Sequence, residues 1–537
     1  MCNNAAMNPH SSSTRLAPLV RRFARRCAAL LLFTACAAQA AELRIGVAAD
    51  ITSIDPHHIN IGSNSSALWH FYDALTHVNA DARLVPGLAE SWRAVDATTW
   101  EFKLRRNVKF HDGTPFGADD VIASIERARA MEKSGGQFAG FTKAITGMQA
   151  VDSQTIRFKT AAPYALLPYD LVSIFIVSKK MQAVTSEDFN TGKQTGGTGP
   201  FKLAAFKRGD RIEMMRNDAY WGGAAPWDKV SLRILPNDGP RIAGLLAGDV
   251  DMIENIPTTD AAKLKSKPEF RLAQKVSWRT IFFTMDQERD QVPGLNDKAG
   301  KPLAKNPFKD IRVRQAISKA LNRGAITQRV MEGMAIPASN VVAPPVFGYA
   351  KDLQPDAPDP EGAKKLLAAA GYPDGFAMTV YAPNNRYVND EQVAQAVAQM
   401  LTRVGIAAKV ETFPVTVYLG RARNGEFPFA MLGWGSFAGD LALRTLLATP
   451  NPDKGFGAWN WGKHTLPPMD KLLIEGFGNT DEKKREALAV QAMGLAMKNY
   501  GVIPVHHQIA SWAMKKNLDY AARTDEFTFA QHVKPVP

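Results

Sequence analysis

Three side chains near residue 70 have the types and the spacing of a metal site. His70, Asp73 and His77 fall at positions i, i+3 and i+7 of a predicted helix, 67–78. The same helix carries an apolar stripe, and a histidine beside such a stripe is more often a packing residue than a ligand. Two pairs of neighbouring histidines elsewhere lack the HExxH spacing of a metalloprotease helix. We therefore predict no metal site and no cofactor.

Nucleophilic and phosphate-binding motifs are the next candidates for chemistry. Ser436 is followed by Phe-Ala-Gly, so it does not lie at the centre of a G-x-S-x-G elbow. The run TGGTGPF at 195–201 lacks the Lys-Ser/Thr pair that a phosphate loop requires. We interpret that run as a glycine-rich crossing between domains, and a secreted hydrolase that uses Ser436 is only a remote alternative.

Three tryptophans are better suited to binding than to catalysis. Trp434, Trp459 and Trp461 each offer a flat apolar face and one N–H donor on which a ligand group can stack. A place in the hydrophobic core is an equally good interpretation for each of them. Since no reactive constellation accompanies them, the residue pattern favours a binding protein over an enzyme.

The first forty residues have the three parts of a secretory signal. Five arginines between 15 and 26 precede an apolar run, 27–38, and the small-x-small sequence AQA ends at residue 40. The run is too short to span a membrane. We predict cleavage after residue 40 and a periplasmic protein, with lipid attachment at Cys36 as the minor alternative. All three cysteines precede the cut, which excludes disulfides and thiol chemistry from the mature chain.

Charge and hydropathy exclude two further classes. The 537-residue chain has a net charge of +13, and removal of the signal leaves 60 of its 65 basic residues against 52 acidic ones. The basic residues are scattered rather than gathered in a stripe, so we predict no nucleic-acid binding. After residue 40 no apolar run approaches the roughly 20 residues needed to cross a bilayer.

One stretch, 89–121, predicts the scaffold that positions the other elements. Trp100, Phe102 and Leu104 alternate with polar residues, as in a strand with one buried face. The segment HDGTP that follows has turn chemistry, because glycine tolerates a positive φ and proline supplies no ladder donor. Two aspartates then open a helix after Gly117.

The same stretch carries a resemblance to a known family. The run AESW, the alternating strand and LR-x-x-VKFHDGTPF-x-A-x-DV are similar to the signature of the family 5 solute-binding proteins of ABC importers. That family includes the dipeptide- and oligopeptide-binding proteins. TGPF at 198–201, RNDAYW at 216–221 and NPFKDIRVRQA at 306–316 resemble further landmarks of the family.

The resemblance implies an α/β, two-lobed periplasmic-binding-protein fold of type II, in the large peptide-binding class. The first lobe, 41–278, would contain an extra subdomain at about 79–170, and 506–537 would return to it. The second lobe would span 279–505. Two crossovers would join the lobes.

Local patterns predict the elements within these lobes. Helices are expected where apolar residues recur every three or four positions, and strands where they alternate. The crossovers are expected at 278–284 and 503–506. The expected helices are 67–78, 361–370, 390–403 and one that carries Val313, Ala316, Ile317, Ala320 and Leu321; the expected strands are 43–47, 151–159, 378–381, 406–410 and 429–433.

The resemblance also implies where a ligand would bind. In peptide-binding relatives an aspartate that follows a tryptophan receives the ligand's ammonium group. Here Trp434 is in place, but Phe437 stands at the aspartate position and Asp440 is displaced by three residues. An unpaired ammonium in a dry site is costly, so a substitute acid would be required for a peptide cargo. Arg386 beside Tyr387 is the candidate for a ligand carboxylate, with Arg421 and Arg423 as fallbacks that are otherwise surface residues.

Ser63, Asn64 and Ser65 complete the candidate site, because they correspond to a loop that faces the ligand in relatives. No catalytic and no metal-binding residue is predicted. The ligand-binding candidates are Ser63, Asn64, Ser65, Arg386, Tyr387, Trp434, Gly435, Ser436, Phe437, Asp440 and Trp459.

The implied function is that of the periplasmic substrate-binding component of an ABC importer. Such a protein closes on a peptide or peptide-like solute and delivers it to an inner-membrane permease through a transient contact. We expect a monomer without enzymatic activity. The alternative cargoes are a glutathione-like conjugate, an opine, a nickel complex or haem.

Overall fold

The computed structural model describes residues 41–131, 138–194, 196–452 and 455–537. The predicted signal sequence lies outside the described residues. Glu42–Pro537 forms one compact unit of mixed α/β structure, built on one large sheet and a smaller four-stranded sheet. Among the described residues, no helix combines the length and the hydropathy of a membrane span.

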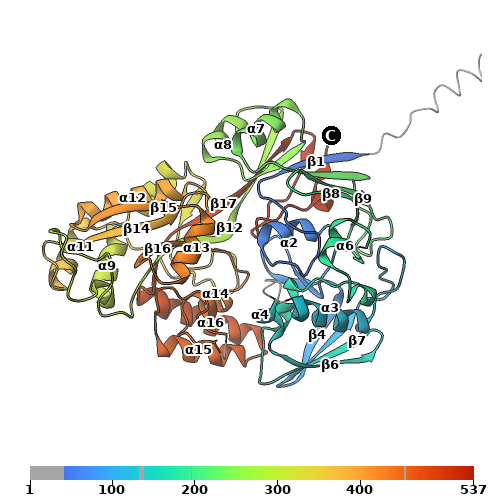
Figure 1. Ribbon diagram of the computed structural model, residues 1–537, viewed down its shortest axis with the longest axis horizontal. Helices are drawn as coiled ribbons and strands as arrows, with labels where there is room; N and C mark the ends of the chain where they lie inside the picture. The colour runs from blue at the N-terminus through green and yellow to red at the C-terminus, as the bar shows by residue number, and fades with distance from the viewer. Residues whose placement is uncertain (1–40, 132–137, 195, 453–454) are drawn as a thin grey trace, which may run out of the picture. The chain divides into compact units, whose positions relative to one another are not determined.

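Two long antiparallel strands, β12 (Phe270–Met285) and β17 (Val502–Lys515), form the middle of the large sheet (Figure 1). Strands from distant parts of the chain join on both sides, in the order β15-β14-β16-β12-β17-β11-β1-β10-β9-β8, and β13 pairs with β17. The bounds of these strands are Ala407–Phe413 (β15), Ala377–Pro383 (β14), Phe429–Trp434 (β16), Met252–Glu254 (β11), Glu42–Val47 (β1), Lys229–Ile234 (β10), Arg211–Arg216 (β9), Phe201–Lys207 (β8) and Ala335–Pro337 (β13).

The pairing of β12 with β17 is interrupted near its centre. The register runs as far as Val276 and resumes at Thr280. Between them, the backbone N–H of Trp278 donates to the carbonyl of Thr524 at 2.8 Å instead of to β17. Both predicted crossovers lie within these two strands, so their strand character is confirmed. The interruption therefore takes the backbone of Trp278 out of the β12·β17 ladder.

The stretch 89–121 folds as predicted. It forms β4 (Ala89–Asp96), β5 (Thr99–Leu104), a turn, and the start of α3 (Ala118–Ala130). Trp100, Phe102 and Leu104 are buried in a core of their own with α3.

Glu101 departs from the expected alternation, because it is buried between two arginines. Arg93 and Arg157 each bind its carboxylate at 2.8 Å, and they stand on the two strands beside β5. A charged side chain is tolerated at a buried position when it is paired in this way.

One predicted strand, 151–159, is right only from Thr155 onward, where Ile156 and Phe158 are buried and the strand pairs with β5 as expected. The chain forms instead a hairpin of β6 (Ile145–Asp152) and β7 (Thr155–Thr160). Asp152 closes the turn by accepting the backbone N–H of Gln154 at 2.7 Å. Val151, expected to be inward, is 44% exposed. An Asx-type turn in the middle of the alternating pattern explains the error.

The predicted helix 67–78 is also wrong. Helix α2 spans Gly62–Leu68, and Thr76–Val78 forms β2, which pairs with β3 (Leu84–Pro86). The chain between them bonds to distant segments, since the carbonyls of His70 and Phe71 accept the N–H groups of Phe201 and Gly199. These tertiary hydrogen bonds override the helical periodicity of the sequence.

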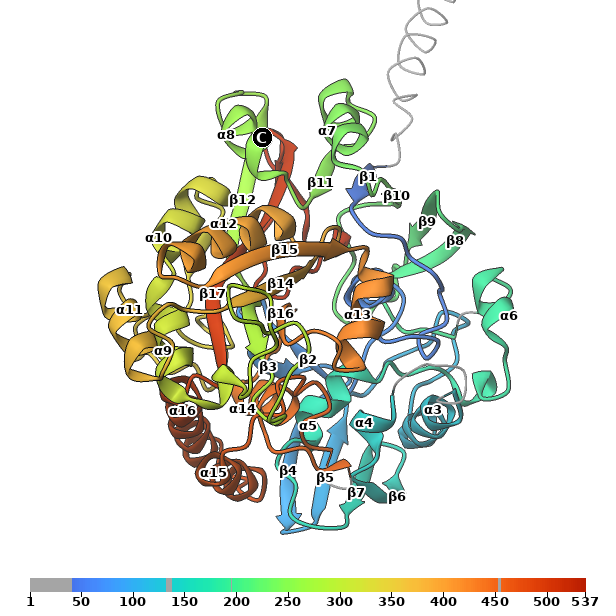
Figure 2. The same ribbon diagram turned by 60° about the vertical axis from the view of Figure 1, so that its left-hand side comes forward.

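The other predicted elements of residues 279–505 are found. Helix α12 (Asp390–Arg403) lies against the parallel strands β14 and β15 (Figure 2). Helices α9 (Ile311–Ala320) and α11 (Pro360–Ala369) pack against each other. The predicted apolar face of α9 is buried, with Val313, Ala316, Ile317, Ala320 and the capping Leu321 in one core.

The remaining elements include α14 (Gly439–Leu446), α15 (Pro467–Phe477) and α16 (Glu482–Lys498), which pack together in one core with residues of the large sheet. The other helices are α4 (Ala139–Thr142), α5 (Leu167–Asp170), α6 (Ser186–Asn190), α7 (Asp238–Ala247), α8 (Thr258–Lys265), α10 (Arg323–Ala325) and α13 (Val415–Arg423). The 3-10 and π turns are η2 (Leu171–Ser173), η3 (Lys179–Met181), η4 (Pro307–Lys309), η5 (Ile326–Val330) and η7 (Ala530–His532), and β18 (Leu518–Asp519) pairs with β19 (Lys534–Pro535).

Candidate ligand-binding site

The candidate site is centred on the segment Trp434–Gly439, which we call the tryptophan loop. Strand β16 pairs with β12 so that Trp434 lies opposite Thr280, where the interrupted β12·β17 pairing resumes. The loop then leaves the sheet and enters α14 at Gly439. The sheet therefore places the tryptophan loop beside Trp278.

Gly435 allows a close approach between the loop and Trp278. A Cβ atom at position 435 would lie 2.6 Å from the indole Nε1 of Trp278, closer than any side chain allows. The ring of Trp278 contacts Phe437 on one side and Phe527 on another, with ring centroids 6.4 and 5.8 Å apart. Its N–H is buried and has no hydrogen-bond partner among the described residues. Trp278 is not among the residues predicted for the site.

Phe437 occupies the position at which peptide-binding relatives were expected to carry an aspartate. Its ring stacks on Tyr169, with centroids 6.0 Å apart and planes 19° apart. Together with Trp278 it forms an apolar, partly buried surface. This surface offers no charge to an ammonium group, and the nearest acid along the chain is Asp440.

The carboxylate of Asp440 is already bound within the protein. Arg485 of α16 donates to its two oxygens at 2.7 and 3.3 Å, and both side chains are almost completely buried. The guanidinium of Arg485 lies between the rings of Tyr169 and Phe347, 4.3 and 4.4 Å from their centroids. The charge of Asp440 is thus compensated inside the fold.

Ser436 is held by its own turn. Its hydroxyl donates to the carbonyl of Ala438 at 2.8 Å and accepts the N–H of the same residue at 3.3 Å. The side chain is buried. The hydroxyl therefore stabilises the tryptophan loop, and its hydrogen bonds do not run to a base.

Arg386 and Tyr387 precede α12, and Tyr387 reaches Gly433, the residue before the tryptophan loop. The backbone N–H groups of both donate to Asp390 at 2.9 and 3.0 Å, which fixes the turn. The Tyr387 hydroxyl donates to the carbonyl of Gly433 at 3.2 Å. The side chain of Arg386 is exposed, and its guanidinium lies 5.7 Å from the centre of the Tyr387 ring.

Trp434 begins a series of three tryptophans. Its ring lies 5.4 Å from that of Trp459, which in turn lies 5.4 Å from Trp461. The guanidinium of Arg423, at the end of α13, lies 5.3 Å from the Trp459 ring. All three indoles are partly exposed, so they are neither wholly core nor wholly surface.

The predicted residues of the amino-terminal part lie on helix α2 rather than in a loop. The buried amide of Asn64 donates to the hydroxyl of Thr52 and the carbonyl of Ser53, both at 3.2 Å. Ser63 and Ser65 are half-buried on the same helix. Phe527 is 3.9 Å from a Cβ built at Gly62, so one ring lies between the start of α2 and Trp278.

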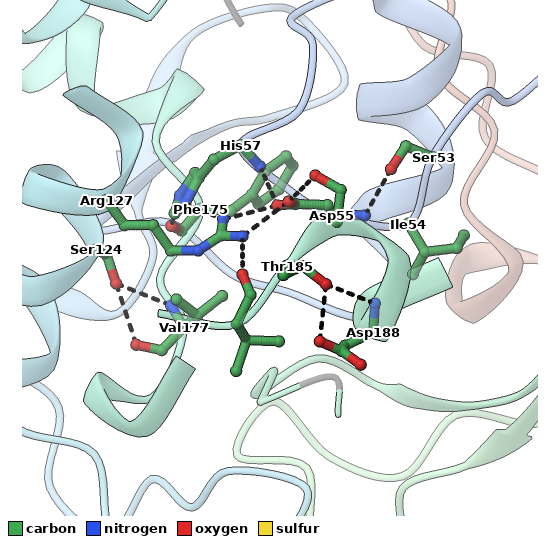
Figure 3. Close-up of polar contacts among 12 residues, drawn as sticks. Ser53, Ile54, Asp55, His57, Ser124, Arg127, Phe175, Val177, Thr185 and Asp188 are labelled. Atoms are coloured by element: carbon green, nitrogen blue, oxygen red, sulfur yellow. Dashed lines mark hydrogen bonds and ion pairs between the residues drawn. The ribbon is translucent and has the colours of Figure 1, made fainter. Parts of the chain in front are cut away.

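A buried ion pair holds the segment to which Asn64 is bonded (Figure 3). Arg127 of α3 binds both oxygens of Asp55, at 2.7 and 2.8 Å. The Ser186 hydroxyl also donates to Asp55 at 2.7 Å. Burial, the largest single effect, would raise the pKa of Asp55, but the Arg127 guanidinium together with hydrogen bonds from the His57 N–H and the Ser186 hydroxyl holds that pKa below its usual value.

His57 completes this network in its neutral form. Because arginine only donates, the 3.0 Å contact from Arg127 shows that Nδ1 of His57 is an acceptor, and its Nε2–H donates to the carbonyl of Phe175 at 2.9 Å. Burial, assisted by the charge of Arg127, lowers the pKa of His57 to about 4. Its hydrogen bonds are those of a packing residue.

His70 and Asp73 are likewise hydrogen-bonded within the fold, and the His77 ring packs on Trp69 with centroids 4.0 Å apart. His70 bonds to the carbonyl of Ala67 through Nδ1 and accepts the N–H of Ala530 through Nε2, both at 3.0 Å. Asp73 accepts the hydroxyl of Thr198 at 2.8 Å and the indole N–H of Trp221 at 2.9 Å. The described residues contain no group of histidine, cysteine and acidic side chains that could hold a metal ion.

A second ion pair that the sequence did not reveal lies beside Trp278. Arg279 binds Glu526 at 2.6 Å, and the Ser277 hydroxyl donates to the same carboxylate at 2.6 Å. Glu526 is 247 residues from Arg279 along the chain. The sequence predicted a crossover in this part of β12, but no local pattern indicated that Glu526 would pair with Arg279.

Comparison with known proteins agrees with the arrangement of these elements. The model of the family described as "Bacterial extracellular solute-binding proteins, family 5 Middle" matches residues 83–448. The dipeptide-binding protein of Escherichia coli is 31% identical over 441 residues, covering 76% of this chain and 78% of that protein. Haem-binding protein A of Haemophilus influenzae is 30% identical, with 79% of each chain covered.

The fold resembles that of a periplasmic binding protein of known structure. The periplasmic binding protein DppA of Helicobacter pylori, solved with the peptide STSA, has a TM-score of 0.74 and 24% identity, covering 92% of this chain and 98% of that one. This likeness shows the α/β, two-lobed periplasmic-binding-protein fold. The chain belongs to family 5 of the bacterial extracellular solute-binding proteins, the solute-binding components of ABC importers.

Proposed function

We propose that this chain binds a peptide or peptide-like solute between its lobes and delivers it to an inner-membrane ABC permease. The observation that carries the proposal is the aromatic cluster of the tryptophan loop. Phe437 and Trp278 contact Tyr169 and Phe527, which belong to segments before and after the predicted second lobe. A solute that contacts this cluster would touch both lobes.

The lobes are proposed to be 41–278 with 506–537, and 279–505, with a subdomain at about 79–170. The interruption in the β12·β17 pairing falls at 277–279, next to one of these boundaries, and supports it. A short break in a long two-stranded connection is a suitable hinge. A solute that contacts both lobes binds the closed form better and shifts the hinge equilibrium toward it.

The proposed binding surface consists of the tryptophan loop and its neighbours. Trp278 and Phe527 join the predicted set because they contact it. Asn64 and Ser436 would contribute by holding the backbone in place, since their polar atoms are bonded internally. The proposed ligand-contacting residues are Ser63, Ser65, Trp278, Arg386, Tyr387, Trp434, Gly435, Phe437, Trp459 and Phe527.

We further propose that residues 1–40 are a cleaved export signal and that the mature protein is a monomer without enzymatic activity. Family members are binding proteins of the periplasm or the cell exterior, which supports export. The hydrogen bonds of Ser436 to its own turn argue against its use as a nucleophile. Lipid attachment at Cys36 is the alternative to release into the periplasm.

Native mass spectrometry of the chain exported to the periplasm tests the proposal. We expect a mass about one small solute above that of a monomer that begins at residue 41, and loss of this excess mass on mild unfolding. Titration calorimetry with the released solute should give a micromolar or tighter Kd, about −8 kcal/mol or more favourable. A folded chain that carries no solute, and shows neither heat nor a thermal shift with peptides, glutathione, opines, haem or nickel–histidine, would contradict it.

A further inference from the structure

The segment 164–170, in the proposed first lobe, packs against helices α14 and α16 of the proposed second lobe. At its start, the Tyr164 hydroxyl accepts an N–H of Arg444 from α14 at 3.0 Å. The same hydroxyl donates to the carboxylate of Asp170 at 2.5 Å, and Asp170 is only 1% exposed. One tyrosine therefore joins a buried acid of the first lobe to an arginine of the second.

Tyr169 makes a second contact between the same two parts of the chain. Its ring is buried, and the guanidinium of Arg485 from α16 lies 4.3 Å from the ring centre. Its hydroxyl donates to the carboxylate of Glu482, also on α16, at 3.1 Å. The ring also stacks on Phe437 of the tryptophan loop. Tyr169 thus connects this contact to the candidate ligand-binding site.

Backbone and apolar contacts extend the boundary between these parts. The N–H of Ala165 donates to the carbonyl of Phe477, the last residue of α15, at 2.7 Å. Leu166 is buried in the same core as residues of α14, α15 and α16. Every one of these contacts has both partners within the chain, so none of them requires a solute.

We infer that Tyr164, Tyr169 and Asp170 form a latch, which holds the two lobes together through Arg444 and Arg485 before any solute is bound. This inference rests on the proposed function, because it assumes that these lobes open and close around a solute. The latch sets the fraction of the chain that is closed in advance. That fraction in turn changes the apparent affinity for the solute.

The groups around Asp170 make the latch depend on pH. Burial raises the pKa of Asp170 to about 6, although Arg444 and Arg485 favour its charged form, and the nearby charge of Asp440 raises it further. Helix α4 and the turn η2, which also pack against α5, carry no titratable side chain. When the lobes open, solvent reaches the carboxylate and its pKa should return toward the ordinary value near 3.9. Protonation of Asp170 therefore favours closure, and this contribution is lost as the pH rises through about 6.

Pulsed EPR distances between two spin labels test the latch in the mature full chain. The labels are attached at Lys159→Cys on β7 and Lys471→Cys on α15, because both lysines are exposed and residues 41–537 contain no other cysteine. Solute is removed by unfolding and refolding, and native mass spectrometry checks its absence. We expect a shorter, closed distance population and a longer, open one, with the closed-to-open ratio falling about fourfold from pH 5.5 to pH 7.5.

Two substitutions then show whether the latch residues are responsible. Tyr164→Phe keeps the ring but removes the hydroxyl between Asp170 and Arg444, and it should lower the closed-to-open ratio about fivefold at pH 5.5. Asp170→Asn keeps an acceptor without a titratable charge, so the ratio should no longer fall between pH 5.5 and pH 7.5. Tyr372→Phe is the matched control, because Tyr372 packs on Phe376 in another core of the second lobe. It should change neither the ratio nor its pH dependence.

The outcomes separate the latch from the proposed function. A solute-free chain that is open at both pH values overturns the latch, and so does a single unchanged population in the parent and in both latch variants. A pH effect that persists in Asp170→Asn also overturns it. If the released solute still closes the open chain, the proposed function stands although the latch has failed. If the latch variants behave as expected but added solute changes no distance, the latch is supported and the proposed function fails.

Discussion

Arg127, on the one hand, and Arg386 and Arg423, on the other, differ in burial and in ion pairing. Arg127 is buried and bound to Asp55 and His57. Its charge is therefore compensated within the fold, and its hydrogen bonds join α3 to the segment 52–57. Arg386 and Arg423 are exposed, rest on aromatic rings and pair with no acid among the described residues. A buried, paired charge stabilises the fold, whereas an exposed charge that forms no salt bridge contributes little to stability.

Substitution of the buried arginine, Arg127, tests the comparison with the largest expected effect. Arg127→Met leaves Asp55 as a buried carboxylate without its cation, and we expect the free energy of unfolding to fall by about 3–5 kcal/mol. Urea denaturation measures this. Arg423→Met, a matched change at an exposed arginine, should cost no more than about 0.5 kcal/mol. Similar losses for the two variants would remove the distinction between the two sets.

The close approach at Gly435 gives the next largest effect. In Gly435→Ala the added methyl group must displace the Trp278 ring, at a cost of about 1–3 kcal/mol, and it should shift tryptophan fluorescence and weaken solute binding. Gly420→Ala in α13 is the control, because a Cβ there meets nothing within 4 Å, so stability should stay equal or rise slightly. A Gly435→Ala protein with unchanged stability and fluorescence would show that the contact is not tight.

Asp170 sharpens the comparison, because it is a buried acid whose charge is poorly compensated. Tyr164 donates to it at 2.5 Å, and burial raises its pKa to about 6, the opposite direction from Asp55. An unfolded aspartate titrates near pH 3.9, so the stability linked to this group is complete below that pH and is lost as pH rises through about 6.

Asp170→Asn should therefore stabilise the protein relative to the parent by about 1–3 kcal/mol at pH 7.5, and the difference should vanish toward pH 4. Urea unfolding of both proteins between pH 4 and pH 8 measures this. Asp55→Asn is the control of opposite sign, because the pKa of Asp55 is lowered and its stabilising effect is already complete above pH 5. A constant difference between the Asp170→Asn variant and the parent across this range would contradict the raised pKa.

The smallest expected effect on stability is at Trp459, beneath the exposed Arg423. Trp459→Leu removes the ring beneath Arg423, and we expect a loss of stability of about 1 kcal/mol, since cation–π contacts at exposed sites are weak. Thermal unfolding measures it. If Trp459 contacts the solute, the loss of binding free energy should exceed this loss of stability. A variant that loses stability but keeps its affinity would place Trp459 in the core only.

Much of the scaffold was predictable because its signals are local. The strand with Trp100, Phe102 and Leu104, and the helix after Gly117, depend on alternation and turn chemistry within a few residues. Helix 390–403 was predicted with its observed bounds for the same reason. The errors at 67–78 and 151–159 arose where distant backbone partners or a single turn residue overrode a local pattern.

The site was predictable only in part. The sequence and its resemblance to the family pointed to Trp434 and to Arg386, but not to Trp278, Phe527 or the pairing of Arg279 with Glu526. These residues approach only because two strands far apart in the chain run side by side in one sheet.

The amino-acid sequence by itself determined the family, whose members are periplasmic or extracellular, and most local elements, because those depend on patterns within a few residues. Only the tertiary structure decided which charged side chains are paired in salt bridges and which are exposed without one. Asp440 and Arg386 are both charged residues beside turns in the sequence, yet one is neutralised by Arg485 and the other is left exposed. Burial and ion pairing arise from contacts between distant segments, and local sequence does not record those contacts.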